Sequence, residues 1–413
     1  MGRRIRRWMT VPTACLVAFP ITTPALAAIP RPRSEQWWLR QWQAEKIWSL
    51  TQGQGVTVAV LDGGVNAHLP DLAGRVLPGG DMLGGGTNGL KDLDTRQHGT
   101  NIAGLIAAQG QGTGMLGIAP RSRILSIRMN NETHGSGSDK NMAAAIRSAV
   151  RQGAKVINIS LAAGSDTGRV CDPEREAAVT EALQRDVIVV AGAGNNIHER
   201  NVPLQPAACP GVLAVGSLDR KGRPDLYSQP QSYVAVSAPG VEIASIREES
   251  FAPKGYIEKD LRGTSLATAL VSGVVALVRS RYPQMPAREV LRRITATAED
   301  VKPKGRDTKT GFGAVRPYEA LTAQLPASAP NPVYEAWERS RRERALHPLP
   351  GRTQETIRDV VPLRTRMIQI GTAVGVLVLV GIGTATVVVL IVRRRTRTRS
   401  RPFRSDPGPA PRL

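Results

Sequence analysis

From residue 55 onward the chain alternates between two kinds of segment. Short and almost wholly apolar runs are typical of strands buried on both faces of a parallel sheet, and they occupy residues 55–61, 124–129, 156–160, 187–191, 212–215 and 233–236. Longer segments fit helices, at residues 98–107, 138–152, 174–185 and from Thr264 to about 282. Strands that alternate with helices predict an α/β fold: a doubly wound, mainly parallel sheet with helices on both faces.

Three polar residues stand where apolar runs of this predicted sheet end. Asp62 follows the first run, Ser160 closes the third, and Asn195 comes after the fourth and a glycine-rich turn. In open α/β sheets the chemistry lies beyond the carboxyl ends of the strands, so we expect a functional site at this edge. Each residue alone also has a plainer explanation, Asp62 as a turn former and Asn195 as a residue that tolerates a left-handed turn.

The last predicted helix begins in an unusual way. A loop carrying Gly263, Thr264 and Ser265 runs directly into an apolar stretch of small residues that Pro283 ends. Ser265 is thus expected at a helix N-terminus, where free backbone N–H groups and the helix dipole favour a developing negative charge. A nucleophile for acyl transfer is useful there, because the oxyanion forms within reach of those donors. For an isolated Gly-Thr-Ser, a simple helix cap is the alternative.

Both ends of the chain carry apolar segments with basic flanks. Residues 1–27 combine a basic start, an apolar run and Ala25-Leu26-Ala27, the pattern of a secretory signal peptide. Residues 367–392 contain no charge and are long enough for one C-terminal transmembrane helix, which the basic tail 393–413 follows. Together they predict a single-pass cell-membrane protein whose main domain is extracellular and whose C-terminus is cytoplasmic.

Three further segments lie between these ends. Residues 28–50 form an N-terminal arm that crowds four tryptophans, Trp37, Trp38, Trp42 and Trp48. The arm is too short to fold alone, so we expect it to pack along the next domain. The α/β domain spans residues 51–324. Residues 325–364 are rich in proline and arginine, which predicts a stalk with one short helix near residues 333–345.

The formal net charge of +21 at first suggests a nucleic-acid partner. Arginines nevertheless cluster at residues 3–7 and 393–412, beside the two terminal apolar segments, and these clusters carry about half of the excess. Basic blocks in such places are signals of membrane topology. No nucleic-acid partner is therefore expected.

Cysteine usage fits an oxidising compartment. Cys15 would leave with the signal peptide, which keeps Cys171 and Cys209 in the mature chain. One disulfide is the economical interpretation, and two buried free thiols are the alternative. The two cysteines bracket the run 187–191 and the turn to Asn195, so a bridge would brace loops beside the expected site.

Aspartate, histidine and serine occur in that chain order, as Asp62, His98 and Ser265. The order and its contexts resemble the subtilisin-like serine proteases, the subtilases. Further motifs look like the family's aspartate strand, histidine helix, substrate-pairing strand, oxyanion asparagine and the strand before the serine, at residues 58–65, 98–104, 158–161, 193–195 and 238–241. The resemblance covers roughly residues 35–323 and implies a subtilisin-like fold.

The resemblance also implies a role for each matching residue. Ser265 would be the nucleophile, His98 the general base and then acid, and Asp62 the residue that orients His98. The side chain of Asn195 and the backbone N–H of Ser265 would bind the oxyanion. The substrate-binding set would be Ser160, Leu161, Ala162 and Gly194, with backbone near 160–162 and 127–129 pairing an extended peptide as an added strand.

Three positions depart from the family's usual pattern. The family usually has serine or threonine where Gly63 stands, proline where Ala269 stands, and glycine where Ala162 lines the first specificity pocket. None of these departures removes a catalytic group. Each could slow the site or narrow its specificity.

Within the subtilases, the whole plan resembles the mycosins, membrane-anchored proteases of type VII secretion systems. That resemblance implies subunits of a membrane secretion complex as partners. The protease resemblance adds a protein or peptide substrate, and the predicted membrane segment adds the lipid bilayer. Subtilases are commonly kept inactive by a folded prodomain. The arm here is too short to form a core of its own, so we expect a permanent structural wrap instead.

Two functions from different classes fit these features. The first is an extracellular serine endopeptidase associated with a secretion system, which four intact residues favour: Asp62, His98, Asn195 and Ser265. The second is a weakly active or inactive protease-fold scaffold that stabilises a membrane secretion complex, for which the departures at Gly63 and Ala269 leave room. We expect no cofactor and no metal site of clustered acidic residues, although calcium held by backbone carbonyls would leave no sequence signal.

Overall fold

The computed structural model describes residues 31–130, 139–165, 169–195, 201–301 and 304–346. The predicted signal peptide, the predicted membrane segment 367–392 and the basic tail lie outside these residues. Within the described part of the chain, no helix combines the length and the apolar character needed to cross a membrane.

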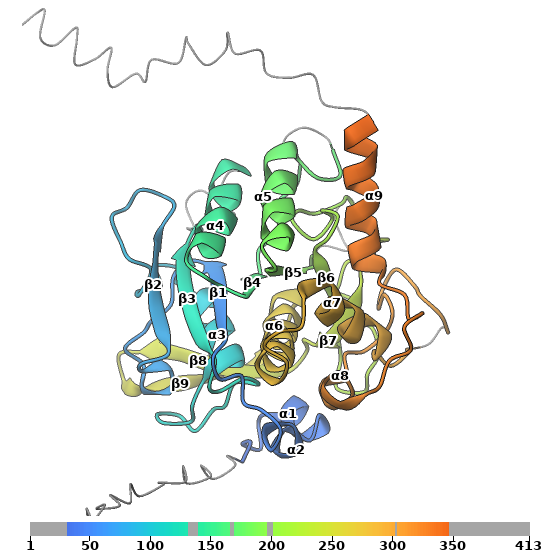
Figure 1. Cartoon of the computed structure of the whole chain (residues 1–413). Helices are drawn as coiled ribbons and strands as arrows, with labels where there is room; N and C mark the ends of the chain where they lie inside the picture. The colour runs from blue at the N-terminus through green and yellow to red at the C-terminus, as the bar shows by residue number, and fades with distance from the viewer. Residues whose placement is uncertain (1–30, 131–138, 166–168, 196–200, 302–303, 347–413) are drawn as a thin grey trace, which may run out of the picture. The chain divides into compact units, whose positions relative to one another are not determined.

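Seven parallel strands of the described residues form the central sheet, in the order β2-β3-β1-β4-β5-β6-β7 (Figure 1). Their bounds are β1 Thr57–Asp62, β2 Val76–Asp81, β3 Arg123–Arg128, β4 Val156–Ile159, β5 Ile188–Gly192, β6 Leu213–Leu218 and β7 Val236–Pro239. β1 pairs with β3 on one side and with β4 on the other, so the chain winds outward in both directions from β1. The predicted doubly wound, parallel sheet is confirmed.

Helices cover both faces of this sheet (Figure 1). α4 (Asp139–Arg151) and α5 (Pro173–Gln184) lie together on one face, and α3 (His98–Ala107) and α6 (Thr264–Arg281) on the other. Nearly all residues of α6 are buried. Its small side chains allow this close packing, because a Cβ added at Gly273 would come within 2.2 Å of Ile118 Cγ2. Two further helices, α7 (Ala287–Ala296) and α8 (Pro317–Thr322), follow α6.

Two strands differ from the sequence prediction. The strand predicted at residues 233–236 exists but is displaced along the chain, since β7 begins only at Val236. The residues before it turn, and the N–H of Val234 donates to the carbonyl of Gln231 at 3.1 Å. β2 was not predicted, because Pro78 and the two glycines after it argue against a strand. It is an edge strand with a bulge, a position where proline is tolerated.

An antiparallel hairpin, also not predicted, leads into α6. Its strands are β8 (Ile243–Glu249) and β9 (Ala252–Leu261). β8 packs on α3, where the hydroxyl of Ser245 donates to the carbonyl of Asn101 at 2.6 Å. β9 is largely half-buried or exposed and rich in charged residues, so it lacks the apolar signal of a core strand. The hairpin ends at Leu261, and Arg262 alone separates it from Gly263.

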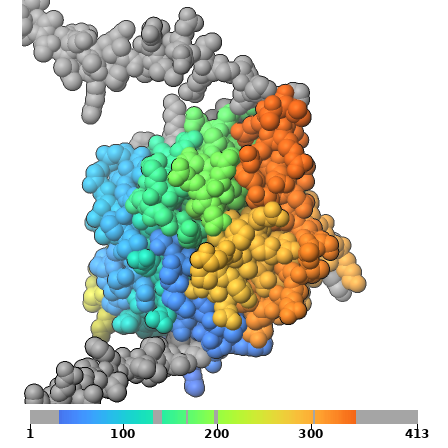
Figure 2. Space-filling model, viewed as in Figure 1, coloured from blue at the N-terminus to red at the C-terminus, as the bar shows by residue number. Residues whose placement is uncertain are grey.

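The N-terminal arm packs against the domain, as predicted. It contains two short helices, α1 (Trp37–Gln41) and α2 (Ala44–Trp48), which lie in blue at one end of the view in Figure 2. Trp38 and Trp48 are buried. The indole N–H of Trp48 donates to the carbonyl of Ile118 at 2.8 Å, and that of Trp37 to the carbonyl of Glu242 at 2.9 Å. The domain thus buries the rings of Trp38 and Trp48 and accepts hydrogen bonds from the indole N–H groups of Trp37 and Trp48.

The short helix predicted in the stalk is confirmed as α9 (Pro332–Leu346). It lies beside α5 (Figures 1 and 2). Its Val333 and Trp337 side chains are buried, and the Trp337 indole N–H donates to the hydroxyl of Thr180 on α5 at 3.3 Å. At least this part of the predicted stalk therefore packs on the domain.

Truncation of Trp48 should destabilise the fold far more than truncation of Trp42. Trp48→Ala removes a buried ring and its hydrogen bond, so we expect the free energy of unfolding to fall by about 3–5 kcal/mol. Trp42 is only partly buried and is the matched control. Urea denaturation of the two variants measures the difference. Equal losses would contradict a tightly docked arm.

Candidate active site

Asp62 and His98 meet where β1 ends and α3 begins. The side chain of Asp62 is fully buried, and Nδ1 of His98 lies 2.9 Å from its Oδ2 and 3.1 Å from its Oδ1. The backbone N–H of Gly63 donates to Asp62 Oδ1 at 2.8 Å. α3 can begin this close to β1 because residue 99 is glycine: a Cβ there would lie 2.1 Å from the carbonyl oxygen of Gly64.

Burial and nearby carboxylates shift the pKa of His98 in opposite directions. Burial by itself lowers the pKa of His98, but the Asp62 carboxylate raises it through charge and hydrogen bonding. The negative charges of Asp94 and Asp92 act in the same direction, and the net pKa lies above the ordinary histidine value. The ring is therefore held by a carboxylate that favours its protonated form.

Ser265 is the second residue of α6, after the N-cap Gly263 with a φ of 148°. Its hydroxyl donates to the carbonyl of Ser160 at 2.9 Å, and the hydroxyl of Ser160 donates to the carbonyl of Ser265 at 2.9 Å. These reciprocal bonds tie the start of α6 to the end of β4. The hydroxyl of Ser265 is thus turned to Ser160 rather than to His98, although both residues line the same cleft. Rotation about a single side-chain bond redirects it.

Asn195 follows β5 and faces the start of α6. Its Oδ1 accepts hydrogen bonds from the backbone N–H of Thr264 at 2.8 Å and from the Thr264 hydroxyl at 3.0 Å. Because a backbone N–H can only donate, the atom facing it must be the amide oxygen. The Nδ2 donor is consequently on the other side of the amide. Gly194, with a φ of 114°, makes the turn that places Asn195 there.

One cleft of about 560 Å³ brings these side chains together. His98, Asn195, Ser160, Leu161, Ala162 and Ser265 line it. Asp62 lies beneath His98, and Gly194 is buried and does not line the cleft. Sequence reasoning missed the other lining residues, which are Asp94, Arg96, Asn101, Asn130, Tyr227, Glu258, Leu261, Arg262 and Leu266. Three of these residues stood close to a recognised motif: Asn101 lies within the segment 98–104, Arg262 is three positions before Ser265, and Leu266 directly follows it.

The expectation that backbone at residues 127–129 pairs with a peptide is wrong. Ile127 and Arg128 belong to β3, which lies between β1 and β2. The N–H of Met129 donates to the carbonyl of Asp62 at 2.8 Å, and the carbonyl of Arg128 accepts from Met82 at 2.8 Å. Both edges of this strand are already occupied, so no added strand can pair there.

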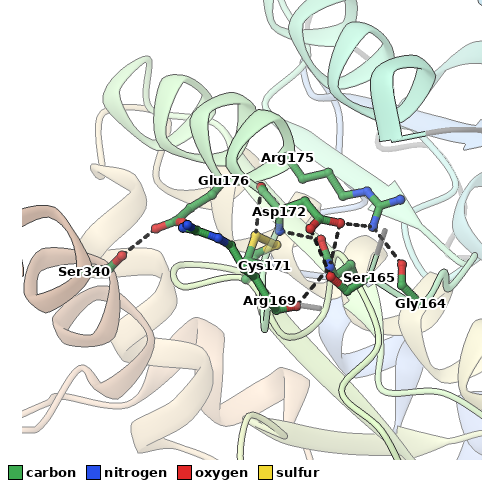
Figure 3. Close-up of a disulfide and its surroundings, with 10 residues drawn as sticks. Gly164, Ser165, Arg169, Cys171, Asp172, Arg175, Glu176 and Ser340 are labelled. Atoms are coloured by element: carbon green, nitrogen blue, oxygen red, sulfur yellow. Dashed lines mark hydrogen bonds and ion pairs between the residues drawn. A yellow bond between two sulfur atoms is a disulfide. The ribbon is translucent and has the colours of Figure 1, made fainter. Parts of the chain in front are cut away.

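The predicted Cys171–Cys209 disulfide is present (Figure 3). Beside it, the backbone N–H of Asp172 donates to Oε1 of Gln205 at 2.9 Å, and Nε2 of Gln205 donates to Oδ2 of Asp172 at 3.0 Å. Gln205 also exchanges two backbone hydrogen bonds with Ala163, at 3.0 and 2.8 Å. The disulfide region therefore braces the segment that directly follows Ala162, on the wall of the cleft.

Comparisons with known proteins agree with this geometry. The profile of the subtilase family (Peptidase S8) matches residues 53–313. Mycosin-3 of Mycobacterium tuberculosis is 34% identical over 331 residues, which cover 68% of this chain and 70% of mycosin-3. The structure of the MycP3 protease from the type VII (ESX-3) secretion system is 33% identical, with a TM-score of 0.60 over 72% of this chain and 91% of that one.

A second solved structure places a similar chain in an assembly. The periplasmic assembly from the ESX-5 inner membrane complex contains a chain that is 28% identical, with a TM-score of 0.63. The match covers 75% of this chain and 88% of that chain.

Asp62→Asn should lower the pKa of His98. Without the carboxylate, burial dominates and disfavours the imidazolium. Because the pKa of His98 is higher in the folded than in the unfolded protein, the wild-type Asp62–His98 pair adds to the free energy of unfolding. This contribution is fully present below the unfolded pKa of histidine, about 6.5, and is lost as the pH rises through the folded pKa. NMR titration of the His98 ring measures the shift. Asp71→Asn, near the other end of α3, is the control that leaves it unchanged.

Proposed function

This chain belongs to the subtilase family of serine endopeptidases, and we propose that Asp62, His98 and Ser265 are its catalytic triad. The observation that carries this proposal is the buried Asp62 carboxylate, 2.9 Å from Nδ1 of a histidine that shares a cleft with Ser265. A base held by a third group and facing a serine is the arrangement that nucleophilic catalysis needs.

The first step is proton transfer from Ser265 to His98. Nδ1 of His98 faces Asp62, so Nε2 is the nitrogen available to accept the hydroxyl proton. The hydroxyl has to leave the carbonyl of Ser160 to reach it. Catalytic hydrogen bonds often form only when substrate is bound, and a peptide carbonyl beside Ser265 would favour that rotation. As His98 takes the proton, Oγ of Ser265 bonds to the carbonyl carbon of the peptide. The C–N bond then breaks and His98 gives the proton to the leaving amine, while Asp62 stabilises the imidazolium between the two transfers. A water molecule deprotonated by His98 finally hydrolyses the acyl-serine ester.

Two donors are available for the oxyanion. Nδ2 of Asn195 is the free side of an amide whose oxygen is fixed by Thr264. The backbone N–H of Ser265 is in the first turn of α6, where N–H groups have no partner within the helix. Both donors belong to the same corner between β5 and α6. Removal of one donor of this kind typically costs about 10²–10³ in kcat.

The substrate is an extended peptide that pairs with the backbone of residues 160–162. Ser160, Leu161 and Ala162 line the cleft next to Ser265. The methyl group of Ala162 takes space in the wall where the family usually has glycine, which favours a small side chain in that subsite. The charged residues Asp94, Glu258 and Arg262 around the cleft give it a further means of selection.

The cellular setting that we propose is the outer side of a cell membrane, beside a type VII secretion complex. The similarity to mycosin-3 and to the MycP3 protease supports it, as do the signal-peptide pattern and the uncharged segment 367–392. None of the described arm residues, 31–50, lines the cleft, which supports a permanent wrap rather than an inhibitor. The arm's burial against the domain supports the same role.

A scaffold that stabilises the secretion complex is the second candidate function. It is favoured by the similarity to a chain of the periplasmic assembly from the ESX-5 inner membrane complex, where a chain of similar fold is part of a larger structure. The two functions are separable, because only the protease needs a reactive Ser265.

Ser265→Ala should abolish peptide cleavage and labelling by a fluorophosphonate probe while the fold persists. Loss of a triad member costs on the order of 10⁶ in rate, whereas removal of one hydroxyl at a helix start costs about 1 kcal/mol of stability. Ser280→Ala, near the other end of the same helix, removes a hydroxyl that donates to the carbonyl of Gln54 and is the control that keeps both cleavage and labelling. A wild-type chain that is folded but never labelled would favour the scaffold instead.

Removal of residues 363–413 should release the protein from membranes. The truncated chain keeps every residue of the described domain and the whole of α9. We expect it in the soluble fraction after carbonate extraction, with undiminished peptide cleavage, while the full chain stays with the lipid. A truncated chain that remains membrane-bound in detergent-free buffer would locate the anchor elsewhere.

A further inference from the structure

Gly63 follows the proposed catalytic aspartate and has no room for a side chain. A Cβ added there would lie 2.9 Å from Oδ1 of Asp92 and 2.9 Å from Cβ of Asp94. The carbonyl of Gly63 also accepts a hydrogen bond from the N–H of Leu93 at 3.1 Å. The loop before α3 thus lies directly against the end of β1, and the carboxyl of Asp92 takes part of the space that a side chain at position 63 would need.

Asp92 is buried and accepts hydrogen bonds from α3. Both the backbone N–H and the hydroxyl of Thr100 donate to its Oδ2, at 2.8 Å each. The backbone N–H of Asp94 donates to Oδ1 at 3.1 Å. Thr100 lies on the first turns of α3, two residues after His98, so the Asp92 carboxyl holds the end of the helix that carries the histidine.

Asn66 extends the same network towards β1. Its Oδ1 accepts from the backbone N–H of Asp92 at 2.8 Å, and its own N–H donates to the Thr100 hydroxyl at 3.0 Å. Its Nδ2 donates to Oε1 of Gln97, the residue before His98, at 3.0 Å. The segment after β1, the loop with Asp92 and the start of α3 are therefore joined by polar side chains that are themselves buried or half-buried.

The charge of Asp92 is coupled to the Asp62–His98 pair. Burial and, to a smaller extent, the Asp62 carboxylate raise the pKa of the Asp92 carboxyl, while the hydrogen bonds from Thr100 and Asp94 lower it, and the net value is about 7. The acidic groups that act on His98 are Asp62 at the end of β1 and Asp94 and Asp92 on the loop before α3. Removing the Asp92 charge should therefore lower the pKa of His98.

We propose that Asp92 is a positioning residue for His98: its carboxyl joins Thr100 on α3 to the loop packed against Gly63, and so keeps the imidazole on Asp62. This role rests on the proposed triad. It also accounts for glycine at position 63, because a side-chain hydroxyl there and the Asp92 carboxyl compete for the same space. Asp92 touches neither the peptide nor the reacting atoms.

The test compares Asp92→Asn with Asp71→Asn in the full chain. Asp71 is a buried carboxyl with the same pattern of donors, two from Thr113 and one from Gly112, but near the other end of α3. Both variants should lose stability. Only Asp92→Asn should lower kcat by about 10- to 100-fold with KM nearly unchanged, the size of loss that a displacement of about 1 Å produces. Only Asp92→Asn should move the acidic limb of kcat/KM and the NMR titration of His98 to lower pH.

A second pair of variants guards against misfolding of Asp92→Asn. Thr100→Val removes the hydroxyl that joins Asp92 to Asn66, and Thr100→Ser keeps it. We expect Thr100→Val to lower kcat and Thr100→Ser to keep kcat near the wild-type value. Gly63→Ala should also cost less kcat in an Asp92→Ala background than in the wild type, with part of the loss kept because Asp94 Cβ remains close.

The outcomes separate this role from the triad itself. A wild-type chain without Ser265-dependent cleavage overturns the proposed function and the role of Asp92 with it. A wild-type chain that cleaves, beside Asp92→Asn and Thr100→Val variants with unchanged kcat and an unmoved acidic limb, overturns the role of Asp92 alone. In that case Asp92 would be a structural carboxyl of the same kind as Asp71.

Discussion

A fully buried carboxylate at the end of β1 is the constraint on which the architecture of the site depends. A buried charge is costly unless it is paired and hydrogen-bonded, and Asp62 meets that need with the Gly63 N–H and the His98 ring. His98 can supply its ring only if α3 begins against the end of β1. That contact requires glycine at position 99, since any side chain would collide with the carbonyl of Gly64. One charge thus fixes the place of a helix and the identity of its second residue.

The other half of the site depends on α6 in a similar way. Its first turn is bonded to the end of β4 through Ser160 and Ser265, and to the end of β5 through Thr264 and Asn195. β1, β4 and β5 are neighbours in the sheet. Residues far apart in the sequence are therefore held by strands that are themselves paired to one another, which is how a site gains fixed geometry without relying on a flexible loop.

Sequence patterns predicted the core of this structure and less of its rim. The apolar runs located β1, β3, β4, β5 and β6, and α3 was predicted at residues 98–107 as observed. Asp62, His98, Asn195 and Ser265 were found because each follows or begins such an element. β9 was missed because it is rich in charged residues and pairs with β8 outside the central sheet, so it lacks the apolar run of a core strand. The error at residues 127–129 arose because a single strand pattern does not tell how many neighbours the strand has.

The roles of side chains that depend on tertiary contacts were the hardest to predict. Nothing in the local pattern around Asp92 shows that it lies beneath Gly63, because that contact arises only when the loop before α3 closes on β1. The sequence showed that Gly63 departs from the family's usual pattern, but it did not show the physical reason for glycine at that position. The disulfide could be predicted from cysteine count, whereas its bond network through Gln205 to Ala163 could not.

The docking of the arm has a consequence for the order in which the chain can fold. The indole of Trp37 bonds to the carbonyl of Glu242, 205 residues later, and that of Trp48 to Ile118, 70 residues later. During synthesis from the N-terminus, these rings emerge long before their partners exist. Contacts this distant in sequence slow folding, because loop entropy is lost before the contact is gained. We therefore expect the arm to be among the last segments to reach its place, and to stay open to chaperones or to aggregation until the partner of Trp37 has folded.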